Sequence, residues 1–264
     1  MTREFTSDVS RRTYLKLTGA SSVAGLSATA GCIGGGEKKT ITPGTAPGFP
    51  PFEMKKDGEL VGFDIDLLEA VVAETDYTID KWEEFEFSSL IPALTNKRID
   101  TIAAAMTITE ERQQKIAFSD PYWKSNQAVL VREGGDFQPG DWPDFEGKTV
   151  GAQSGTTGAG VIEKQLVKPG IISKSDFSTY GSYVLAVEDL ENGNIDAIVI
   201  DQPVAKTFAA NREVEVAFIH KTGEQFGFGL RQNEPELQTA LNQGLATVKD
   251  NGTYEDLKKK WFSK

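Results

Sequence analysis

Short runs of aliphatic and β-branched residues alternate with helical patterns along most of this sequence. Five runs are expected to form buried strands, at residues 99–105, 128–131, 148–152, 195–200 and 214–219. Strands that are separated by helices form parallel sheets with both faces covered, so the alternation predicts an α/β fold. Without an N-terminal leader, about 230 residues remain, which is long enough for one large domain or two smaller lobes.

Helical patterns fill the intervals between the expected strands. They are expected over residues 64–75, 88–96, 182–192, 235–250 and 253–262. Ser88 is a candidate N-cap for the second of these helices, and Gly193 follows the third as a stop signal should. Residues 134–144 are dense in Gly, Pro and Asp and form the clearest central loop, near which a second lobe could begin. The pattern leaves open which lobe the last two helices join.

The first 31 residues resemble an export signal and are set aside from the fold. Arg11 and Arg12 are adjacent and are followed by Leu15 and Lys16, as in the twin-arginine signals of proteins that are exported already folded. The apolar stretch at 17–30 is too short and too rich in Gly, Ser and Thr to span a bilayer, which needs about 20 predominantly apolar residues. The alternative is an ordinary amphipathic N-terminus.

Cys32 is the only cysteine of the sequence, and it follows three small residues and precedes glycines at 34–36. This arrangement resembles a lipobox, in which the cysteine becomes the lipidated N-terminus and residues 32–39 form a flexible tether. A lone thiol could instead be free or pair between chains. Lipidation predicts a protein anchored at the extracellular face of the cell membrane, without a disulfide.

The formal net charge is −11 at pH 7. So acidic a chain argues against nucleic acid or anionic lipid as a partner, because both need basic patches. The chain is not composed like a disordered one, since 39% of its residues are hydrophobic and 15 Phe and 4 Trp are available for a core. The acidity together with the twin-arginine pattern resembles proteins of salt-loving archaea, which concerns habitat and not function.

Six groups of residues occur in an order that carries a family resemblance. They are residues 51–53 with 62–67, 87–94, 99–112 with 118–122, 151–157, 195–201, and 251–254 with 260–262. The third group is the most specific, because Met106-Thr107-Ile108-Thr109-Glu110-Glu111-Arg112 leads on to Phe118-Ser119-Asp120-Pro121-Tyr122. Together the groups cover almost all of residues 40–263. They resemble the polar amino-acid-binding family of solute receptors, family 3 of the extracellular solute-binding proteins.

The resemblance implies a two-lobed fold of the periplasmic-binding-protein type II class, with the ligand in the cleft between the lobes. Lobe 1 would comprise residues 40–124 and 226–264, and lobe 2 residues 125–225. Two crossing strands would join them near 122–126 and 224–227, and the C-terminal helices would return to lobe 1. The implied protein is a monomeric receptor that closes on a free amino acid and delivers it to the permease subunits of an ABC importer.

A free amino acid presents a carboxylate and an ammonium, and both must be satisfied when they leave water. The resemblance assigns the carboxylate to Arg112, whose guanidinium offers two parallel donors, with a hydroxyl or backbone donor from Thr107 nearby. It assigns the ammonium to the carbonyl of Ala105 and to Asp201, which follows an apolar strand as ligand groups of α/β folds do. The alternatives are a solvated helix face for Arg112 and a turn-forming role for Asp201.

Residues 153–157 should join a strand to the start of a helix. Unpaired backbone N–H groups at Ser154, Thr156 and Thr157 would form a second carboxylate anchor there, with Gln153 beside them. A plain Ser/Thr helix cap is the alternative, and the run is not a nucleotide-binding loop because no Gly-Lys-Ser/Thr follows. Phe49 and Phe87 are the expected aromatic walls around the ligand side chain, unless they belong to the core.

Two departures from the family concern the ligand side chain. Some relatives carry an acidic residue near position 45 or 46, where this chain has Thr45 and Ala46. Others carry Lys or Arg where it has Gln153. Without either charge, the cleft is expected to favour a neutral or polar side chain over a charged one.

Two rival functions remain on the same fold. A dehydratase-like enzyme is disfavoured, because no Cys–His or Ser–His pair can be assembled around His220, the single histidine, and nothing brings Glu53 and Glu69 together. No cluster has metal-ligand spacing, so neither a metal nor another cofactor is expected. A lipid-anchored amino-acid sensor is the second rival, and it would use the same cleft.

Overall fold

The computed structural model describes residues 38–263, and the first of its two larger sheets has five strands. These strands are β2 (Pro43–Thr45), β6 (Glu83–Glu84), β7 (Thr101–Ile102), β8 (Ala117–Phe118) and β14 (Gly229–Leu230). Their order is β6-β2-β7-β14-β8; β6, β2 and β7 are parallel, and β14 is antiparallel to both of its neighbours. The predicted export signal, the lipidation at Cys32 and residues 33–37 of the predicted tether lie outside the described residues.

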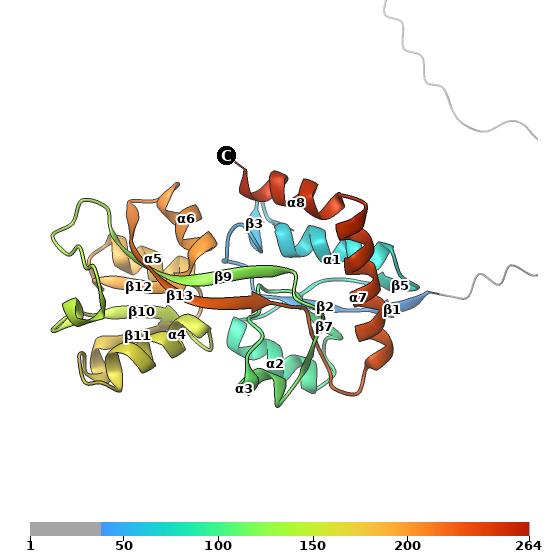
Figure 1. The fold of residues 1–264 in the computed structure, drawn as a ribbon, viewed down its shortest axis with the longest axis horizontal. Coiled ribbons are helices and arrows are strands. Elements are labelled where there is room, and N and C mark those ends of the chain that lie inside the picture. The colour runs from blue at the N-terminus through green and yellow to red at the C-terminus, as the bar shows by residue number, and fades with distance from the viewer. Residues whose placement is uncertain (1–37, 264) are drawn as a thin grey trace, which may run out of the picture. The chain divides into compact units, whose positions relative to one another are not determined.

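The second five-stranded sheet contains the two longest strands of the described chain. Its strands are β9 (Trp123–Arg132), β10 (Val150–Gln153), β11 (Phe177–Tyr180), β12 (Ala197–Asp201) and β13 (Val214–Phe226). The order is β11-β10-β12-β9-β13, with β11, β10 and β12 parallel and with β9 antiparallel to β12 and β13. Figure 1 shows the two sheets in opposite halves of the ribbon, with β9 and β13 running from one half into the other.

The segment that joins the two halves is a short antiparallel ladder, which we call the crossing. It pairs residues 123–125 of β9 with residues 224–226 of β13, in the register Trp123↔Phe226, Lys124↔Gln225 and Ser125↔Glu224. We call residues 38–122 and 227–263 lobe 1, and residues 127–223 lobe 2. The crossing overlaps the two segments for which the sequence predicted strands between lobes.

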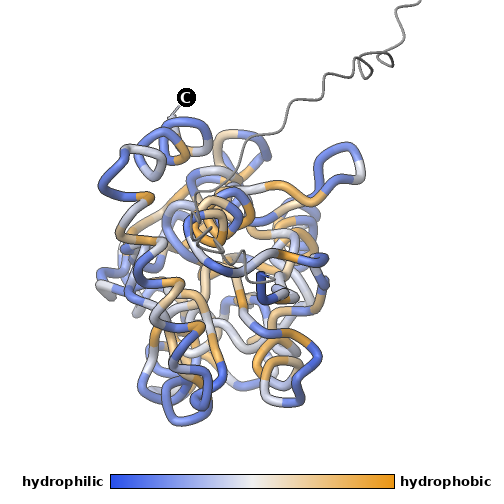
Figure 2. The backbone as a smooth tube through the Cα atoms, turned by 90° about the vertical axis from the view of Figure 1, so that its right-hand side faces the viewer, coloured by the Kyte–Doolittle hydropathy of each residue, from blue (hydrophilic) through white to orange (hydrophobic). Residues whose placement is uncertain are grey.

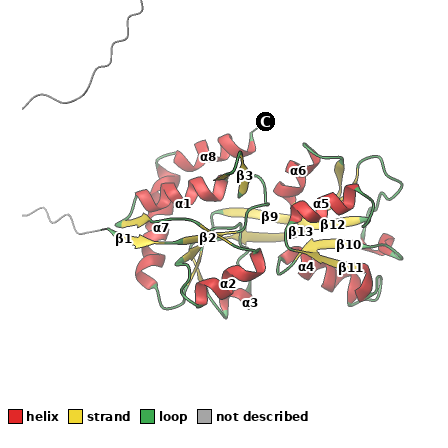
Figure 3. Cartoon of the chain, turned by 180° about the vertical axis from the view of Figure 1, so that it is seen from behind, coloured by secondary structure: helices red, strands yellow, loops and turns green. Residues whose placement is uncertain are grey.

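Helices cover the faces of both sheets (Figure 3). Lobe 1 has α1 (Phe63–Ala73), α2 (Phe87–Thr95), α3 (Glu110–Gln113), α7 (Pro235–Asp250) and α8 (Thr253–Phe262). Lobe 2 has α4 (Thr157–Ile162), which continues into a π-helical turn at Glu163–Val167, as well as α5 (Tyr183–Glu191) and α6 (Gln202–Ala209). Short 3₁₀ turns lie at Trp142–Phe145 and Lys174–Asp176. Two small sheets, β1 (Lys39–Ile41) with β5 (Tyr77–Ile79) and β3 (Met54–Lys56) with β4 (Glu59–Val61), complete lobe 1.

Four local expectations from the sequence are wrong. The sheets are mixed and not purely parallel, because the strands of the crossing and the returning β14 enter antiparallel. The strand expected at 99–105 is only two residues long, since the chain leaves the sheet before Ala105, which has a positive φ of 43°. Ser88 does not cap α2, whose N-cap is Glu86 without a side-chain bond. The strand expected at 214–219 is half-exposed and extends to Phe226, because β13 is an edge strand.

Aromatic rings hold the crossing against lobe 1. The Phe52 ring centroid lies 5.3 Å from that of Trp123 and 5.4 Å from that of Phe226, both edge to face. Phe262, at the end of α8, stacks on Trp123 at 4.2 Å. Figure 2 shows outer turns that are mainly hydrophilic and hydrophobic stretches that run through the interior. Through Phe262, the last helix therefore packs against the crossing that joins the lobes.

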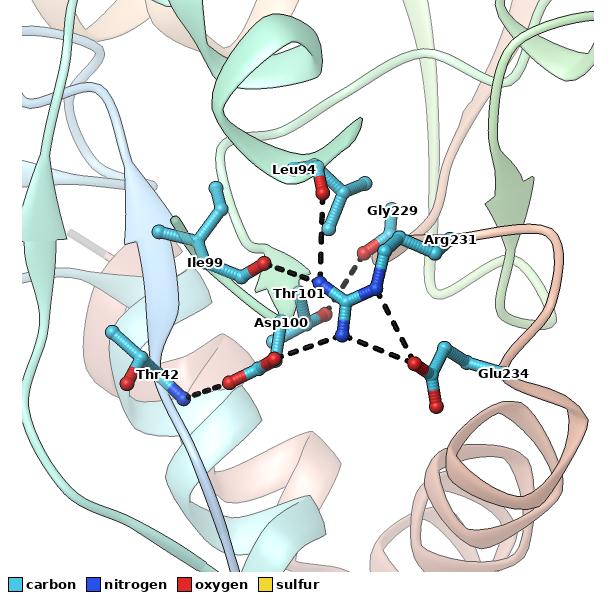
Figure 4. Close-up of polar contacts among 8 residues, drawn as sticks. All are labelled: Thr42, Leu94, Ile99, Asp100, Thr101, Gly229, Arg231 and Glu234. Carbon is cyan, nitrogen blue, oxygen red and sulfur yellow. Dashed lines mark hydrogen bonds and ion pairs between the residues drawn. The ribbon is translucent and has the colours of Figure 1, made fainter. Parts of the chain in front are cut away.

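Arg231 ties the returning C-terminal segment to lobe 1 (Figure 4). Its guanidinium donates to the carbonyl of Ile99 at 2.6 Å, to Asp100 Oδ1 at 2.9 Å and to Glu234 Oε1 at 3.2 Å. Asp100 Oδ2 in turn accepts from the backbone N–H of Thr42 at 2.9 Å. One partly buried cation thus links β14 and the start of α7 to the strands β2 and β7.

Helices α1 and α7 pack so closely that only glycine fits at the contact. A Cβ atom at Gly244 of α7 would lie 2.4 Å from the carbonyl oxygen of Val71 in α1. By contrast, a Cβ atom at Gly160, in α4, would have no heavy atom within 4 Å. Both glycines lie within helices, but they differ in the space that a Cβ atom would have.

We expect Gly244→Ala to lower the free energy of unfolding by about 1–3 kcal/mol, because the backbone contact outweighs the better helix propensity of alanine. For a chain of this size, about 2–4 °C of melting temperature is lost for each kcal/mol. The matched control Gly160→Ala should leave the melting temperature unchanged or raise it. Circular dichroism melts of both variants test this, and a Gly244→Ala protein that melts at or above the parent would contradict it.

Candidate functional site

A small cavity lies between the lobes, where the segments after β7 and β10 meet the end of β12. Its volume is about 10 Å³, which is close to the space that one water molecule needs. It is lined by Phe49, Phe87, Ala104, Ala105, Thr107, Arg112, Gln153, Thr156, Thr157 and Asp201. Nine of the ten ligand-binding residues predicted from the sequence lie around this cavity. The tenth, Ser154, is not part of the lining, and its backbone N–H donates to the carbonyl of Tyr180 at 2.9 Å.

Arg112 lies on the four-residue helix α3 and points into the cavity and not to solvent. Its side chain is held by the protein backbone of both lobes, because Nη1 donates to the carbonyl of Thr107 at 2.7 Å and Nη2 to that of Gly155 at 3.0 Å. The residue is 8% exposed, and its guanidinium lies 5.2 Å from the centre of the Phe87 ring. A guanidinium has five N–H donors, so Arg112 keeps donors for a further partner.

Asp201 is the last residue of β12, and it faces the cavity from lobe 2. It is 4% exposed, and its Oδ1 has no hydrogen-bond partner among residues 38–263. Burial raises the pKa of the Asp201 carboxyl well above its ordinary value, and the charge of Glu224 adds to this, while Gln127, Ser125 and Arg112 oppose it. A cation placed at the free oxygen would favour the ionised carboxylate.

Ala105 is held in its unusual backbone conformation by a buried carboxylate that sequence reasoning missed. Asp64 Oδ2 accepts from the Ala105 N–H at 2.6 Å and from the Tyr122 hydroxyl at 2.5 Å. Burial raises the pKa of Asp64 from 3.8 to about 7, although both hydrogen bonds act in the opposite direction. The available signal was a carboxylate on the apolar face of the helix that contains Leu67 and Leu68.

The two threonines of the lining share a partner on the crossing. Thr107 Oγ1 donates to Glu224 Oε2 at 3.0 Å, and Thr157 Oγ1 donates to the same oxygen at 2.9 Å. Gln127 Nε2 lies 3.2 Å from each Glu224 carboxylate oxygen and 3.1 Å from Thr157 Oγ1. Sequence reasoning placed Glu224 at a crossing strand but gave it no role, because its pattern is that of an ordinary edge-strand carboxylate.

The turn after β10 is organised by its own side chains. Thr156 Oγ1 donates to the carbonyl of Gln153 at 2.7 Å and accepts from the Ala159 N–H at 3.3 Å, so Thr156 is the N-cap of α4. Gln153 Nε2 donates to the carbonyl of Gly181 at 2.9 Å. The cap that the sequence offered as an alternative is thus present. The backbone N–H groups of Ser154 and Thr156 already donate to the carbonyls of Tyr180 and Gln153, so the expectation of unpaired donors at these two residues is wrong.

An aromatic ring and a buried carboxylate neighbour Phe49, outside the set of residues that line the cavity. The Phe49 ring lies 5.6 Å from that of Tyr183, which comes from lobe 2. Glu53 is 1% exposed, and neither of its carboxylate oxygens has a partner among the described residues. Burial raises the pKa of Glu53 well above its ordinary value, and the charges of Asp64 and Asp201 add to this. Glu69 lies apart from it, exposed, and accepts from a tryptophan N–H.

Residues 38–263 contain no group of three or more His, Cys, Asp or Glu side chains arranged to hold a metal ion. His220 lies on β13 with its ring 5.3 Å from that of Trp142 and edge to face with it. No helix within 38–263 is both long and apolar enough to cross a membrane.

Comparison with known proteins gives one consistent answer. Residues 41–264 match the family model of the bacterial extracellular solute-binding proteins, family 3. The chain is 37% identical over 226 residues to a probable histidine-binding protein of Campylobacter jejuni, covering 84% of each chain. It is 36% identical over 233 residues to a putative ABC transporter arginine-binding protein of Escherichia coli K12, covering 86% of this chain and 92% of the relative.

Solved structures agree with these sequence matches. An ancestral arginine-binding protein bound to arginine superposes with a TM-score of 0.80 and 34% identity, covering 86% of this chain and all of the other. The same type of ancestral protein bound to glutamine gives a TM-score of 0.78 at 34% identity, over 85% of this chain and 98% of the other. The two-lobed α/β fold expected from the sequence is confirmed.

Asp64 makes folding stability depend on pH in a defined direction. The folded protein keeps a proton on this carboxyl up to about pH 7, whereas an unfolded chain releases it near 3.8. The folded state therefore binds more protons between these values, and this group's contribution to stability falls as the pH rises from about 4 to about 7.

Asp64→Asn keeps an oxygen that can accept from Ala105 and Tyr122 and removes the titration. We expect the stability of the parent, relative to the variant, to fall by up to about 1.4 kcal/mol per pH unit across this window. Urea unfolding at several pH values measures it, with the exposed Asp57→Asn as the control. Parallel pH profiles for the parent and Asp64→Asn would contradict the assignment.

Proposed function

Because this chain belongs to the bacterial extracellular solute-binding proteins of family 3, we propose that it is the extracytoplasmic receptor of an ABC importer and binds a free amino acid between its lobes. The relatives named above are binding proteins, and no catalytic step is proposed for this chain. The cavity that Arg112 and Asp201 line is the proposed binding site.

One observation carries the proposal: the two ionisable side chains of the cavity lining have opposite charge and come from different lobes. Arg112 belongs to lobe 1 and Asp201 to lobe 2. A zwitterion between them would place its carboxylate on the guanidinium and its ammonium on the free oxygen of Asp201. Such a ligand binds the closed arrangement better than an open one, and this difference in affinity drives closure.

The other lining residues complete a site for an amino acid. The carbonyl of Ala105 is proposed as a second acceptor for the ammonium, and Asp64 fixes its direction. Phe49 and Phe87 are proposed to enclose the ligand side chain, with Gln153 as a polar contact. Most of these groups are already fixed by contacts within the protein, which reduces the entropy that is lost on binding.

Two classes of ligand side chain are candidates for this site. The lining has no charge beyond Arg112 and Asp201, and this favours a neutral or polar side chain such as that of glutamine. Glu53 favours a cationic side chain, because a buried carboxylate without a partner is stabilised by a nearby cation. The two relatives named above carry histidine and arginine in their names, and the ancestral proteins hold arginine or glutamine.

The sequence motifs of the leader extend this proposal to the cell surface. We propose that residues 1–31 direct twin-arginine export and that Cys32 carries a lipid anchor, so that the receptor works at the extracellular face of the membrane. An acidic surface, with a net charge of −11, suits a protein that stays hydrated at high salt. A lipid-anchored sensor would use the same cavity, and stimulation of a reconstituted permease and ATPase separates the two roles.

A thermal-shift screen of the purified protein in high salt against the twenty amino acids tests the binding function. A ligand at a hundredfold excess over its dissociation constant stabilises the protein by about 2.7 kcal/mol. Arg112→Ala should abolish the shift, whereas the matched control Arg98→Ala, an exposed arginine of lobe 1, should keep it. Glutamine as the best ligand would support the neutral class, and arginine or histidine the cationic class. A parent protein that no amino acid stabilises would contradict the proposal.

Asp201 should make binding depend on pH. Its raised pKa means that, as the pH falls through that value, the free receptor takes up a proton that the ligand ammonium must displace. Affinity should therefore weaken by about tenfold per pH unit below the raised pKa. Calorimetry in buffers of different ionisation enthalpy should detect the proton release. A dissociation constant that stays flat from pH 5 to pH 9 would contradict the role of Asp201.

A further inference from the structure

Glu224 lies on the crossing and contacts residues of both lobes. It pairs with Ser125 across the crossing, next to a break in the β13 register between His220 and Glu224. The residue is half-buried, and it forms part of the wall of a groove between the lobes together with Arg112 and Thr157. The irregular strand thus turns a carboxylate toward the interior of the cleft.

The contacts of Glu224 reach both sides of that cleft. Its Oε2 accepts from Thr107 Oγ1 of lobe 1 at 3.0 Å and from Thr157 Oγ1 of lobe 2 at 2.9 Å. The two hydroxyl oxygens lie only 3.4 Å apart. Gln127, on β9, donates to both carboxylate oxygens at 3.2 Å. The lobes must be closed for one carboxylate to make all of these bonds.

These bonds also determine what the two threonines can offer to a ligand. A hydroxyl has a single proton to donate, and both threonines give theirs to Glu224. What remains on each hydroxyl is acceptor capacity, which suits an ammonium and not a carboxylate. Both hydroxyls are thus oriented by the same carboxylate oxygen.

We propose that Glu224 is a positioning residue that closes the lobes and orients the hydroxyls of Thr107 and Thr157 for the ligand. By drawing one donor from each lobe onto a single oxygen, it stabilises the closed arrangement through contacts of the protein itself. Apparent affinity is the intrinsic affinity scaled by the fraction of receptor that is competent to bind. Glu224 raises that fraction before the ligand arrives. The closure step stands whatever the ligand is, whereas the hydroxyl orientation rests on the proposed function.

Glu224→Gln and Glu215→Gln form a matched pair for the test. Both remove one negative charge from β13, but Glu215 accepts only from Gly134 and Gln138, within lobe 2. Small-angle scattering of the full chain gives the radius of gyration without and with a saturating amino acid. We expect the ligand-free radius to rise in Glu224→Gln and to equal the parent value in Glu215→Gln. Saturation should return Glu224→Gln to the radius of the parent.

Calorimetry gives a second measurement, which would stay unchanged if Glu224 had only a structural role. The dissociation constant of Glu224→Gln should rise by the factor by which its closed fraction falls, at an unchanged far-ultraviolet spectrum. If Glu224→Gln fails to fold, Thr157→Val removes the lobe 2 donor while it keeps the charge, and it should give the same expansion. An unchanged ligand-free radius in the folded variant overturns the proposal. If no amino acid binds the parent, the proposed function fails, but the ligand-free radii still decide the closure step.

Discussion

The antiparallel pairing of β9 with β13 is the interaction on which the rest of the structure depends. From lobe 2, Asp201 is positioned by strand β9 of this pair, because Asp201 on β12 pairs with Gln127 on β9. From lobe 1, Arg112 is positioned by strand β13 of this pair. Its guanidinium donates to the carbonyl of Thr107, and Thr107 forms a β-bridge with Phe226 on β13. The two charges that face the cavity are therefore each tied to one of the two paired strands, Asp201 to β9 and Arg112, through Thr107, to β13. Rotation of the lobes about this ladder changes their separation without rebuilding either sheet.

The charges around the cavity are unequal, and this imbalance bears on the ligand. Arg112 is the one cation of the lining, whereas Asp201, Glu224 and the deeper Glu53 and Asp64 are acids. Burial raises the pKa of Asp201, Glu53 and Asp64, so the fold itself favours their protonated forms. A ligand that brings positive charge reverses that preference and releases protons. If the proposed function holds, recognition at this site is coupled to proton binding as well as to lobe movement.

Local pattern predicted much of this molecule, and non-local geometry accounts for the rest. Residues 235–250 and 253–262 form α7 and α8 with the predicted bounds, because apolar periodicity and the surrounding turn residues are local signals. Most of the lining residues could be located by family motif, such as Arg112 on α3 and Asp201 at the end of β12. Asp64 and Glu224 could not, because their roles depend on partners far away in the sequence. The mixed strand directions escaped prediction for the same reason, since chain reversal at the crossing leaves no local periodicity.

Closure that is stabilised by the protein's own contacts does not help the receptor to discriminate between ligands. If the closed arrangement were strongly preferred without a ligand, every amino acid would benefit equally, since uniform stabilisation shifts all affinities together. Selectivity must then come from contacts that differ between ligands, at lining residues such as Gln153 and Phe49. Glu224 contributes to how tightly an α-amino acid is held, whereas the side-chain end of the cavity determines which one. The two properties lie on different residues, so each can change by mutation without loss of the other.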